Sequence, residues 1–189
     1  MSQHNPLQVT TPKARLSFPD LFEPKAFGKD KEPKYKATFL FDKNADLTEM
    51  REAVKLAAKE KWGDVIPKGI KLPFIDGNTK EMDGYEDTIV VNASSKFPPQ
   101  VVNQKCDAVT DKTSVYAGCY VRGSLIANAW EYTEGKSVMG RGVSFYLSAV
   151  QKVADGEPFA KRQNASDLFG AVDTGQNDKS NFESDDFFG

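Results

Sequence analysis

Alternation of apolar and polar side chains is the feature that most limits the folds open to this chain. Successive side chains of a β-strand point to opposite faces, so a period of two predicts a strand that buries one face. The clearest case is KYKATFLF, which places Tyr35, Ala37, Phe39 and Phe41 on one face. The segment at residues 114–132 is long for a strand, and we expect it to bend near Gly123. Five segments are expected to form strands, at residues 14–22, 34–41, 88–93, 114–132 and 142–153.

One segment has a helical period instead. Asp46 is expected to cap its start, with Glu49 three residues on as in a capping box, and Gly63 is expected to close its end. The apolar stripe between them consists of Leu47, Met50, Val54, Ala57 and Ala58. Five strands and one helix in about 160 residues predict a mainly β domain, a small barrel or sandwich. The aromatic residues expected to fill its core are Phe39, Phe41, Trp130, Phe145 and Tyr146.

The distribution of charge divides the chain near Gln163. Residues 163–189 carry six acidic side chains and one lysine, a net charge of −5, which leaves +3 for residues 1–162. The composition of this last segment is dominated by Asn, Ser, Asp, Gly and Gln, with too little apolar surface to offset the entropy of ordering it. We therefore predict a folded domain over residues 1–162 and a disordered acidic tail over residues 163–189.

Several classes of protein are disfavoured by what the sequence lacks. It has no run of about 20 apolar residues and no apolar segment in its opening MSQHNPLQVTTPKARL, so we expect neither membrane insertion nor secretion. A single histidine, His4, removes most chemistry that needs imidazole as a base or a metal ligand. The two cysteines, Cys106 and Cys119, form no CxxC pair and are expected to be reduced, buried thiols.

Acidic residues gather between positions 74 and 87, where a metal-dependent reaction would need them. An EF-hand loop counted from Asp76 fails, because Lys80 stands at a ligand position and Glu81 at the position of the turn glycine. The chain also has no GxxxxGK[ST] phosphate-binding loop. We therefore expect no catalysis, no cofactor and no bound metal. The enzymatic alternative is a Mg²⁺-dependent nuclease that uses these carboxylates and loses its activity in Asp83→Asn.

Basic and aromatic residues are interleaved along several of the predicted strands and loops. Lysine and arginine neutralise phosphates while aromatic rings stack on unpaired bases, so this pattern is typical of single-stranded nucleic-acid binding. On one predicted strand Tyr116, Tyr120 and Arg122 share a face, and Gly118 leaves room for a close approach. The residues expected to contact DNA are Lys29, Lys31, Lys34, Tyr35, Lys36, Lys96, Phe97, Tyr116, Tyr120, Arg122, Lys136 and Arg141.

Four stretches of the chain resemble a phage family of single-stranded DNA-binding proteins of the OB-fold type, formerly catalogued as a domain of unknown function. They are ARLSFPDLFEPKAF (14–27), KYKATFLFDK (34–43), YAGCYVRGSL (116–125) and GRGVSFYLSAVQKV (140–153). The resemblance implies a five-stranded OB-fold-like barrel over residues 1–162, with one helix and extra loops. In the common OB order the helix lies between the third and fourth strands. Here it follows the second, which indicates either an unrecognised strand before Asp46 or a variant of the fold.

The resemblance also implies a function. Such proteins coat and protect unpaired DNA during phage replication or recombination, in the cytoplasm of the bacterial host, without reading its sequence. Their acidic tails recruit replication and recombination proteins and end in phenylalanine, whereas here Gly189 follows. The tail residues expected to bind these partners are Asp185, Asp186, Phe187 and Phe188.

Two further alternatives remain open at this point. The β domain could be a non-enzymatic adaptor or structural protein that binds other proteins, with a tail that only adds solubility. Double-stranded DNA could also bind the same surface, because phosphate contacts do not distinguish one strand from two. Binding of oligonucleotides and duplexes by the isolated domain separates these possibilities.

Overall fold

The computed structural model describes residues 5–26 and 32–160. Over these residues its α-helix is α1 (Thr48–Trp62), and short 3₁₀ turns follow at η1 (Gly77–Lys80) and η2 (Lys112–Ser114). The strands are β1 (Gln8–Thr10), β2 (Ala14–Lys25), β3 (Lys34–Asp42), β4 (Phe74–Asp76), β5 (Thr88–Ser95), β6 (Gln100–Val102), β7 (Tyr120–Glu134) and β8 (Ser137–Ala154).

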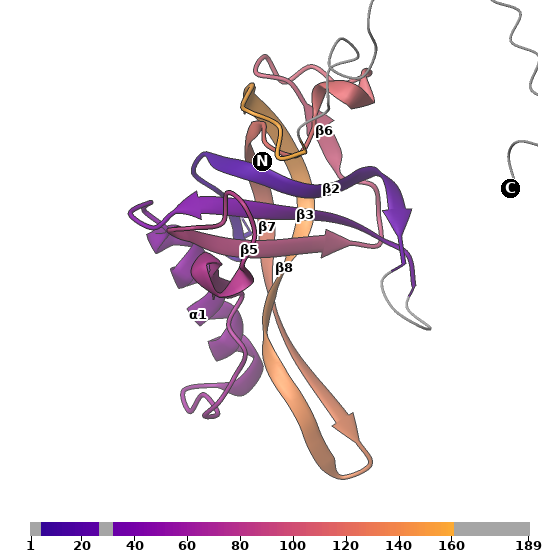
Figure 1. The fold of residues 1–189 in the computed structure, drawn as a ribbon. Coiled ribbons are helices and arrows are strands. Elements are labelled where there is room, and N and C mark those ends of the chain that lie inside the picture. Colours follow the sequence, from indigo (N-terminus) through magenta and orange to yellow (C-terminus); the bar gives the residue numbers. More distant parts are fainter. Residues whose placement is uncertain (1–4, 27–31, 161–189) are drawn as a thin grey trace, which may run out of the picture.

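Five of these strands close into a ring. Their order is β7-β2-β3-β5-β8, and β8 pairs again with β7. The β5–β8 pairing is parallel, and the other pairings of the ring are antiparallel. In Figure 1, β2, β3 and β5 cross steeply over the long β7–β8 hairpin. This arrangement confirms the predicted mainly β, OB-fold-like five-stranded barrel with one helix.

The barrel is filled as the alternation predicts. Phe39, Phe41 and Phe145 are fully buried within it, as expected. Two of the aromatic residues assigned to the core are not enclosed. Tyr146 is 50% exposed, and Trp130 is only partly buried. Both lie on the outer face of the β7–β8 hairpin, because each shares its parity with polar or glycine neighbours rather than with Phe145.

The predicted strand 114–132 is wrong at its start. β7 begins at Tyr120, so Tyr116 and Gly118 lie in the loop before it and do not share a strand face with Arg122. Gly118 has a φ of +112°, and a Cβ there would lie 2.2 Å from the carbonyl oxygen of Glu157. This backbone conformation and close crossing require glycine and interrupt the extended chain. Near Gly123, where a bend was expected, the pairing of β7 with β8 shifts its register between Ser124 and Leu125.

The helix matches its predicted stripe. Asp46 Oδ1 accepts hydrogen bonds from the Thr48 N–H at 3.0 Å and the Thr48 hydroxyl at 2.6 Å, and these bonds lower the pKa of Asp46. The predicted capping box is wrong, because the N-cap residue is Leu47, whose side chain cannot accept a hydrogen bond, and Asp46 lies one position before it. Gly63, with a φ of +77°, donates its N–H to the Lys59 carbonyl and ends the helix. The buried face contains Leu47, Met50, Ala53, Val54, Ala57 and Ala58.

The position of the helix in the chain identifies a variant of the common OB order. α1 lies between β3 and β5, the second and third strands of the ring. β1 precedes α1 and was not predicted, but it pairs only with β7, on the edge away from β8, and is not part of the ring. The helix therefore follows the second ring strand, as the sequence indicated.

The acidic segment 74–87 uses some of its carboxylates in local contacts. Asp87 pairs with Lys43 at 2.8 Å, and Asp76 caps η1 by accepting from the Asn78 N–H. No three metal-ligating side chains cluster within residues 5–26 and 32–160.

The two cysteines lie in different environments. Cys119 is buried, and burial raises the pKa of its thiol. Cys106 is exposed, which corrects the prediction that both thiols are buried, because it lies in a surface turn after Asn103. In the part of the chain that the structure describes, no helix could span a membrane.

Candidate nucleic-acid interface

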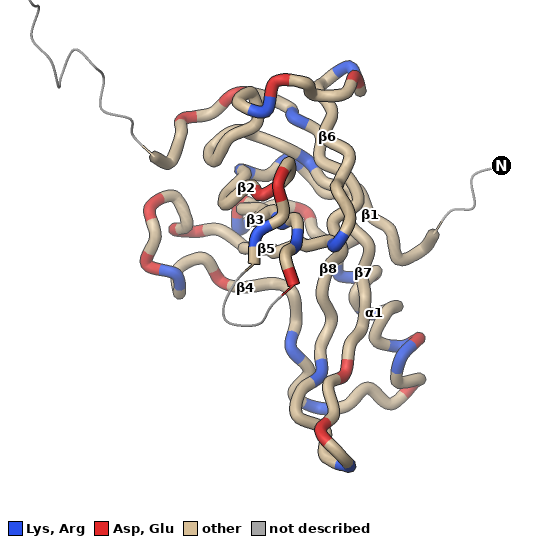
Figure 2. The backbone as a smooth tube through the Cα atoms, turned by 90° about the vertical axis from the view of Figure 1, so that its right-hand side faces the viewer, with Lys and Arg blue, Asp and Glu red and all other residues tan. Residues whose placement is uncertain are grey.

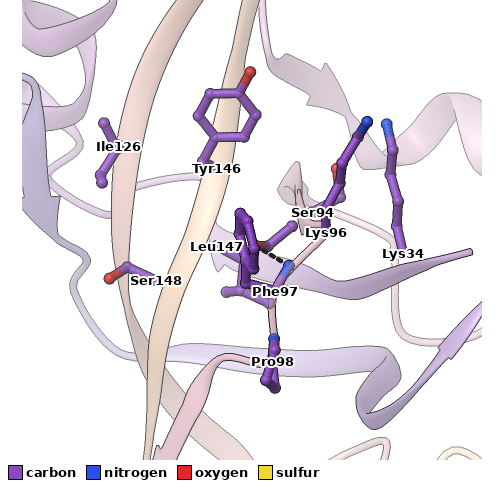
Figure 3. Close-up of a pocket in the computed structure, with 10 residues that line it drawn as sticks. Lys34, Ser94, Lys96, Phe97, Pro98, Ile126, Tyr146, Leu147 and Ser148 are labelled. Atoms are coloured by element: carbon purple, nitrogen blue, oxygen red, sulfur yellow. Dashed lines mark hydrogen bonds between the residues drawn. The ribbon is translucent and has the colours of Figure 1, made fainter.

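An open groove of about 470 Å³ lies where β5 ends beside β8. Ser94 is the register partner of Tyr146 in the parallel β5–β8 pairing, so the end of β5 is brought against the middle of β8. The chain then turns away through SKFPPQ, where the Ser95 hydroxyl accepts the Phe97 N–H at 3.0 Å. We call this the β5–β8 groove; it is lined by Lys34, Ser94, Ser95, Lys96, Phe97, Pro98, Ile126, Tyr146, Leu147 and Ser148 (Figure 3).

Two exposed aromatic rings stand in this groove. Phe97 is 78% exposed and Tyr146 is 50% exposed, so neither ring is held by the core. Ile126 on β7 is the register partner of Tyr146 and extends the apolar surface across the ribbon. In Figure 3 the Tyr146 ring stands on its strand, while Phe97 rises from the turn after β5. Rings displayed in this way offer faces on which unpaired bases can stack.

Two lysines border the same groove. Lys34 begins β3 and Lys96 follows β5, and Figure 3 shows both amino groups at one end of the groove. Lys96 Nζ lies 2.5 Å from Glu32 Oε2, and both side chains are more than half exposed. The lysine holds the pKa of the Glu32 carboxyl below its usual range, and the carboxylate raises the pKa of Lys96. An exposed pair of this kind contributes little stability, so a phosphate can replace the carboxylate.

The substitution Glu32→Gln is expected to strengthen oligonucleotide binding by about two- to fivefold at low salt, because it frees Lys96 from its carboxylate partner. The matched control is Asp87→Asn, which removes one negative charge from another exposed lysine pair at the far end of the β3–β5 ladder. Fluorescence titration of both variants checks the prediction. Equal gains in the two variants would show a general charge effect and contradict a local role for Glu32.

A second, smaller hollow of about 300 Å³ contains Arg122. Arg122 is exposed, and its Nε donates to Gln151 Oε1 at 2.6 Å. The amide of Gln151 is itself fixed, because its Nε2 donates to the Asn103 carbonyl at 3.1 Å. Nearby, Lys13 Nζ lies 5.2 Å from the centre of the Tyr120 ring. Arg122 is therefore held in place from the β8 side, with no acidic residue among the residues that line the hollow.

The hollow and the groove belong to one face of the β7–β8 ribbon. Arg122 and Ile126 have the same parity on β7, whose other face carries Val121 and Leu125 into the core. Their register partners on β8 are Gln151 and Tyr146. A strand lying along this face would pass from a fixed guanidinium to the exposed rings.

The other predicted contact residues are dispersed. Tyr116 donates its hydroxyl to the Gly156 carbonyl at 3.0 Å and is half-buried. Arg141 faces Glu131 at 3.6 Å on the opposite face of the ribbon, and Lys136 lies in the turn between β7 and β8. The remaining two lie on β3 opposite residues of the groove: Tyr35 is half-buried opposite Ser95, and Lys36 is opposite Ser94.

Some predictions fall outside the described residues, and some groove residues were missed. Those outside are Lys29, Lys31, Asp185, Asp186, Phe187 and Phe188. Ile126, Pro98 and Tyr146 were not predicted to contact DNA. For Tyr146 a signal existed, because it alternates with Phe145 and Leu147 and shares its parity with serines.

The closed five-stranded barrel places the protein in the OB-fold class, whose members bind oligonucleotides and oligosaccharides. Its groove carries exposed aromatic side chains and is bordered by lysines. Residues 7–182 match the family model described as the single-stranded DNA-binding protein of Enterobacter phage Enc34. The chain belongs to this family, which confirms the resemblance to phage single-stranded DNA-binding proteins.

Individual relatives agree with the family assignment. "Putative protein p50" of Acyrthosiphon pisum secondary endosymbiont phage 1 is 32% identical over 165 residues, covering 81% of this chain and 86% of that protein. The Enc34 protein solved with single-stranded DNA has a TM-score of 0.67 at 23% identity, over 82% of this chain and 90% of that one. Gp2.5 of bacteriophage T7, a single-stranded DNA-binding protein, has a TM-score of 0.50 at 16% identity, over 83% and 97% of the two chains. These two structures share the fold.

Proposed function

We propose that this protein binds single-stranded DNA, without catalysis, on the outer face of the β7–β8 ribbon and in the β5–β8 groove. The observation that carries the proposal is the presence of two exposed rings, Phe97 and Tyr146, beside Lys34 and Lys96. The Enc34 relative solved in complex with single-stranded DNA supports it.

The mechanism follows from these groups. Lys34, Lys96 and Arg122 neutralise phosphates, while Phe97 and Tyr146 stack on bases that have no pairing partner. Stacking contributes about 1–3 kcal/mol for each base whatever its identity, so sequence preference is weak. Duplex DNA keeps its bases inside the stack and offers only phosphates to this surface, so it binds less tightly. Coating of exposed strands in this way would keep phage replication or recombination intermediates unpaired and protected.

Titration of the full chain with labelled poly-dT and with a duplex, at two salt concentrations, tests the proposal. If about four phosphates are neutralised, the logarithm of the affinity falls against the logarithm of the salt concentration with a slope of about −3. Absence of oligonucleotide binding would favour the protein-binding adaptor instead. Cleavage of the oligonucleotide with Mg²⁺ that is lost in Asp83→Asn would favour the nuclease.

We also propose that residues 163–189 form an acidic tail with two roles, to occupy the cationic surface when DNA is absent and to recruit replication or recombination proteins when DNA displaces it. The charges of −5 on these residues and +3 on residues 1–162 support the competition. An unfolded chain of that length spans about 28 Å, whereas a domain of about 160 residues has a radius of gyration of about 15 Å. The tail could therefore reach the groove of its own domain at about millimolar effective concentration.

Deletion of residues 163–189 is expected to raise the affinity for single-stranded DNA several-fold at low salt, because it removes the competing carboxylates. The gain should disappear at high salt, where the attraction is screened. A matched control keeps the length and replaces the six acidic residues of the tail by their amides, and it should behave as the deletion does. Unchanged or weaker binding after deletion would count against competition.

A further inference from the structure

A second apolar hollow, of about 410 Å³, lies beside β2 and shares no lining residue with the β5–β8 groove. It is enclosed by β2, by the segment that leads from β4 to β5, and by the last described residues of the chain. Its volume is within the range of ligand sites. We call it the Phe18 hollow; its apolar lining residues are Phe18, Pro19, Met82, Ala117, Phe159 and Ala160.

A bulge in β2 places an aromatic ring in this hollow. Ser17 pairs with Thr38 and Asp20 pairs with Lys36, so two residues of β2, Phe18 and Pro19, oppose a single residue of β3. Such a bulge changes the direction of a side chain. Phe18 has a φ of +44°, which is unfavourable for a residue with a large side chain, and its ring is 51% exposed. Backbone strain that leaves an apolar ring in solvent favours a function for this ring.

Another wall of the hollow is held by Phe159. The guanidinium carbon of Arg15 lies 4.1 Å from the centre of the Phe159 ring, and the Phe159 N–H donates to the Ala117 carbonyl at 3.2 Å. Gly84, with a φ of +81°, leaves room for the ring, because a Cβ at this position would overlap it. The hollow is therefore formed by fixed side chains, and the described chain ends at its wall, at Ala160.

The charges around the hollow indicate which kind of segment it can accept. Asp20 and Asp83 both line it, and the lysine that lines it, Lys25, already pairs with Asp20. Asp83 belongs to the loop between β4 and β5, which Figure 2 shows coloured mainly red. These carboxylates repel DNA, and they repel residues 173–189, whose five acidic side chains and one lysine give a net charge of −4. The occupant must therefore be apolar with basic neighbours.

The chain itself has a segment of this chemistry next to the hollow. Residues 161–172, KRQNASDLFGAV, follow Ala160 directly and carry two basic side chains and one acidic side chain. Their apolar pair begins at Leu168, eight residues after Ala160, which is up to about 26 Å of extended chain. This length is ample for a return to a hollow that Ala160 lines, and closing so short a loop costs less entropy than closing a long one.

We infer that this segment folds back onto its own domain, with Leu168 and Phe169 in the Phe18 hollow and its two basic residues at the acidic rim. The folded domain then extends to about residue 172. The acidic tail is reduced to residues 173–189, which keep their charge of −4 and still span about 23 Å as an unfolded chain. The inference goes beyond the proposed function and does not depend on DNA binding.

Trypsin digestion of the full chain tests the inference, because the chain has cleavage sites within the segment and beyond it. Cleavage after Arg162 removes residues 163–189 and cleavage after Lys179 removes residues 180–189, and mass spectrometry follows both rates. A protease cuts a docked segment in proportion to its released population. We expect the double substitution Leu168→Ser with Phe169→Ser to speed cleavage after Arg162 at least about fivefold, without changing cleavage after Lys179. The matched control Phe182→Ser should change neither rate.

Phe18→Ala tests the other side of the same contact. It should speed cleavage after Arg162 as the double substitution does, and combining the two should give no further increase. Its affinity for a short oligo-dT should stay within about twofold of the unchanged chain, because the charge of the tail is the same.

Three results would overturn the inference. The first is an unchanged rate after Arg162 in the double substitution, which lies outside the barrel and does not affect its folding. The second is protection that falls on tenfold dilution of the protein, which would mean that the segment of another copy fills the hollow. The third is weaker oligo-dT binding in Phe18→Ala, which would assign the hollow to DNA. Each would leave the proposed function intact, since oligo-dT binding by the unchanged chain is measured separately.

Discussion

Replacing Phe97 and Tyr146 together by alanine is expected to weaken single-stranded DNA binding by about 100-fold. Each ring stacks on a base for about 1–3 kcal/mol, and 1.4 kcal/mol is a factor of ten in affinity. Both rings are at least half exposed, so their removal costs the core little, and the thermal unfolding midpoint should change by only a few degrees. Fluorescence anisotropy with a labelled oligonucleotide measures the loss.

The control and the salt dependence make this prediction specific. Phe18→Ala removes a ring that is 51% exposed and lines a different hollow with Pro19 and Met82, so it should leave binding unchanged. The ring variant should keep the salt slope of the unchanged chain, whereas Lys34→Ala should reduce the slope by about 0.7. Retention of affinity within about twofold in the double variant, or an equal loss in Phe18→Ala, would contradict stacking in the groove.

The barrel was predictable because its strands bury one face and repeat with a period of two. β3 follows this period of two on one face and departs from it on the other. Phe39 and Phe41 face the core as the alternation predicts, but Leu40 on the other face is also buried, against Tyr85 and Val90. The position of α1 after the second ring strand was predicted for the same reason, since its apolar stripe is regular. β1 was not predicted, because a strand of three residues is too short to show a period of two.

The site was only partly predictable. Lys34, Lys96 and Phe97 were predicted to contact DNA from the interleaving of basic and aromatic residues. Their position beside Tyr146 depends on a parallel pairing between strands about 50 residues apart, which no local pattern encodes. The size and hydrophobic character of Tyr146 favour the core, whereas its parity places it on the outer face. Parity was the better guide, since the pleat decides which face a side chain occupies.

The error at the start of β7 has a backbone cause. The side-chain pattern of residues 114–119 is that of a strand, with Val115 buried and Cys119 buried as predicted. The positive φ of Gly118 breaks the strand nevertheless, so that residues 156–158 can cross over it. A glycine that permits a close crossing looks the same in sequence as one inside a strand, and only the partner backbone distinguishes them.

The largest effect on stability is expected where β3 packs against β7 inside the barrel. Phe39 is fully buried, and a Cβ on Gly123 would lie 2.7 Å from its ring. Phe39→Ala should lower the free energy of unfolding by about 3–5 kcal/mol, because it removes a large side chain and leaves a cavity. Gly123→Ala should cost about 1–3 kcal/mol by overpacking the same space. Urea denaturation measures both as shifts in midpoint at constant slope.

The two positions should also be coupled, and this distinguishes the packing argument from general loss of hydrophobic surface. Phe39→Leu removes the outer ring atoms that meet Gly123, so adding Gly123→Ala to it should cost less than adding it to the unchanged chain. The coupling free energy is expected to be about 1 kcal/mol or more. Val65→Ala, at a position 85% exposed, should change stability by less than about 0.5 kcal/mol and show no coupling. Additive costs for Phe39→Leu and Gly123→Ala would contradict the packing argument, because they would mean that the ring does not occupy the space above Gly123.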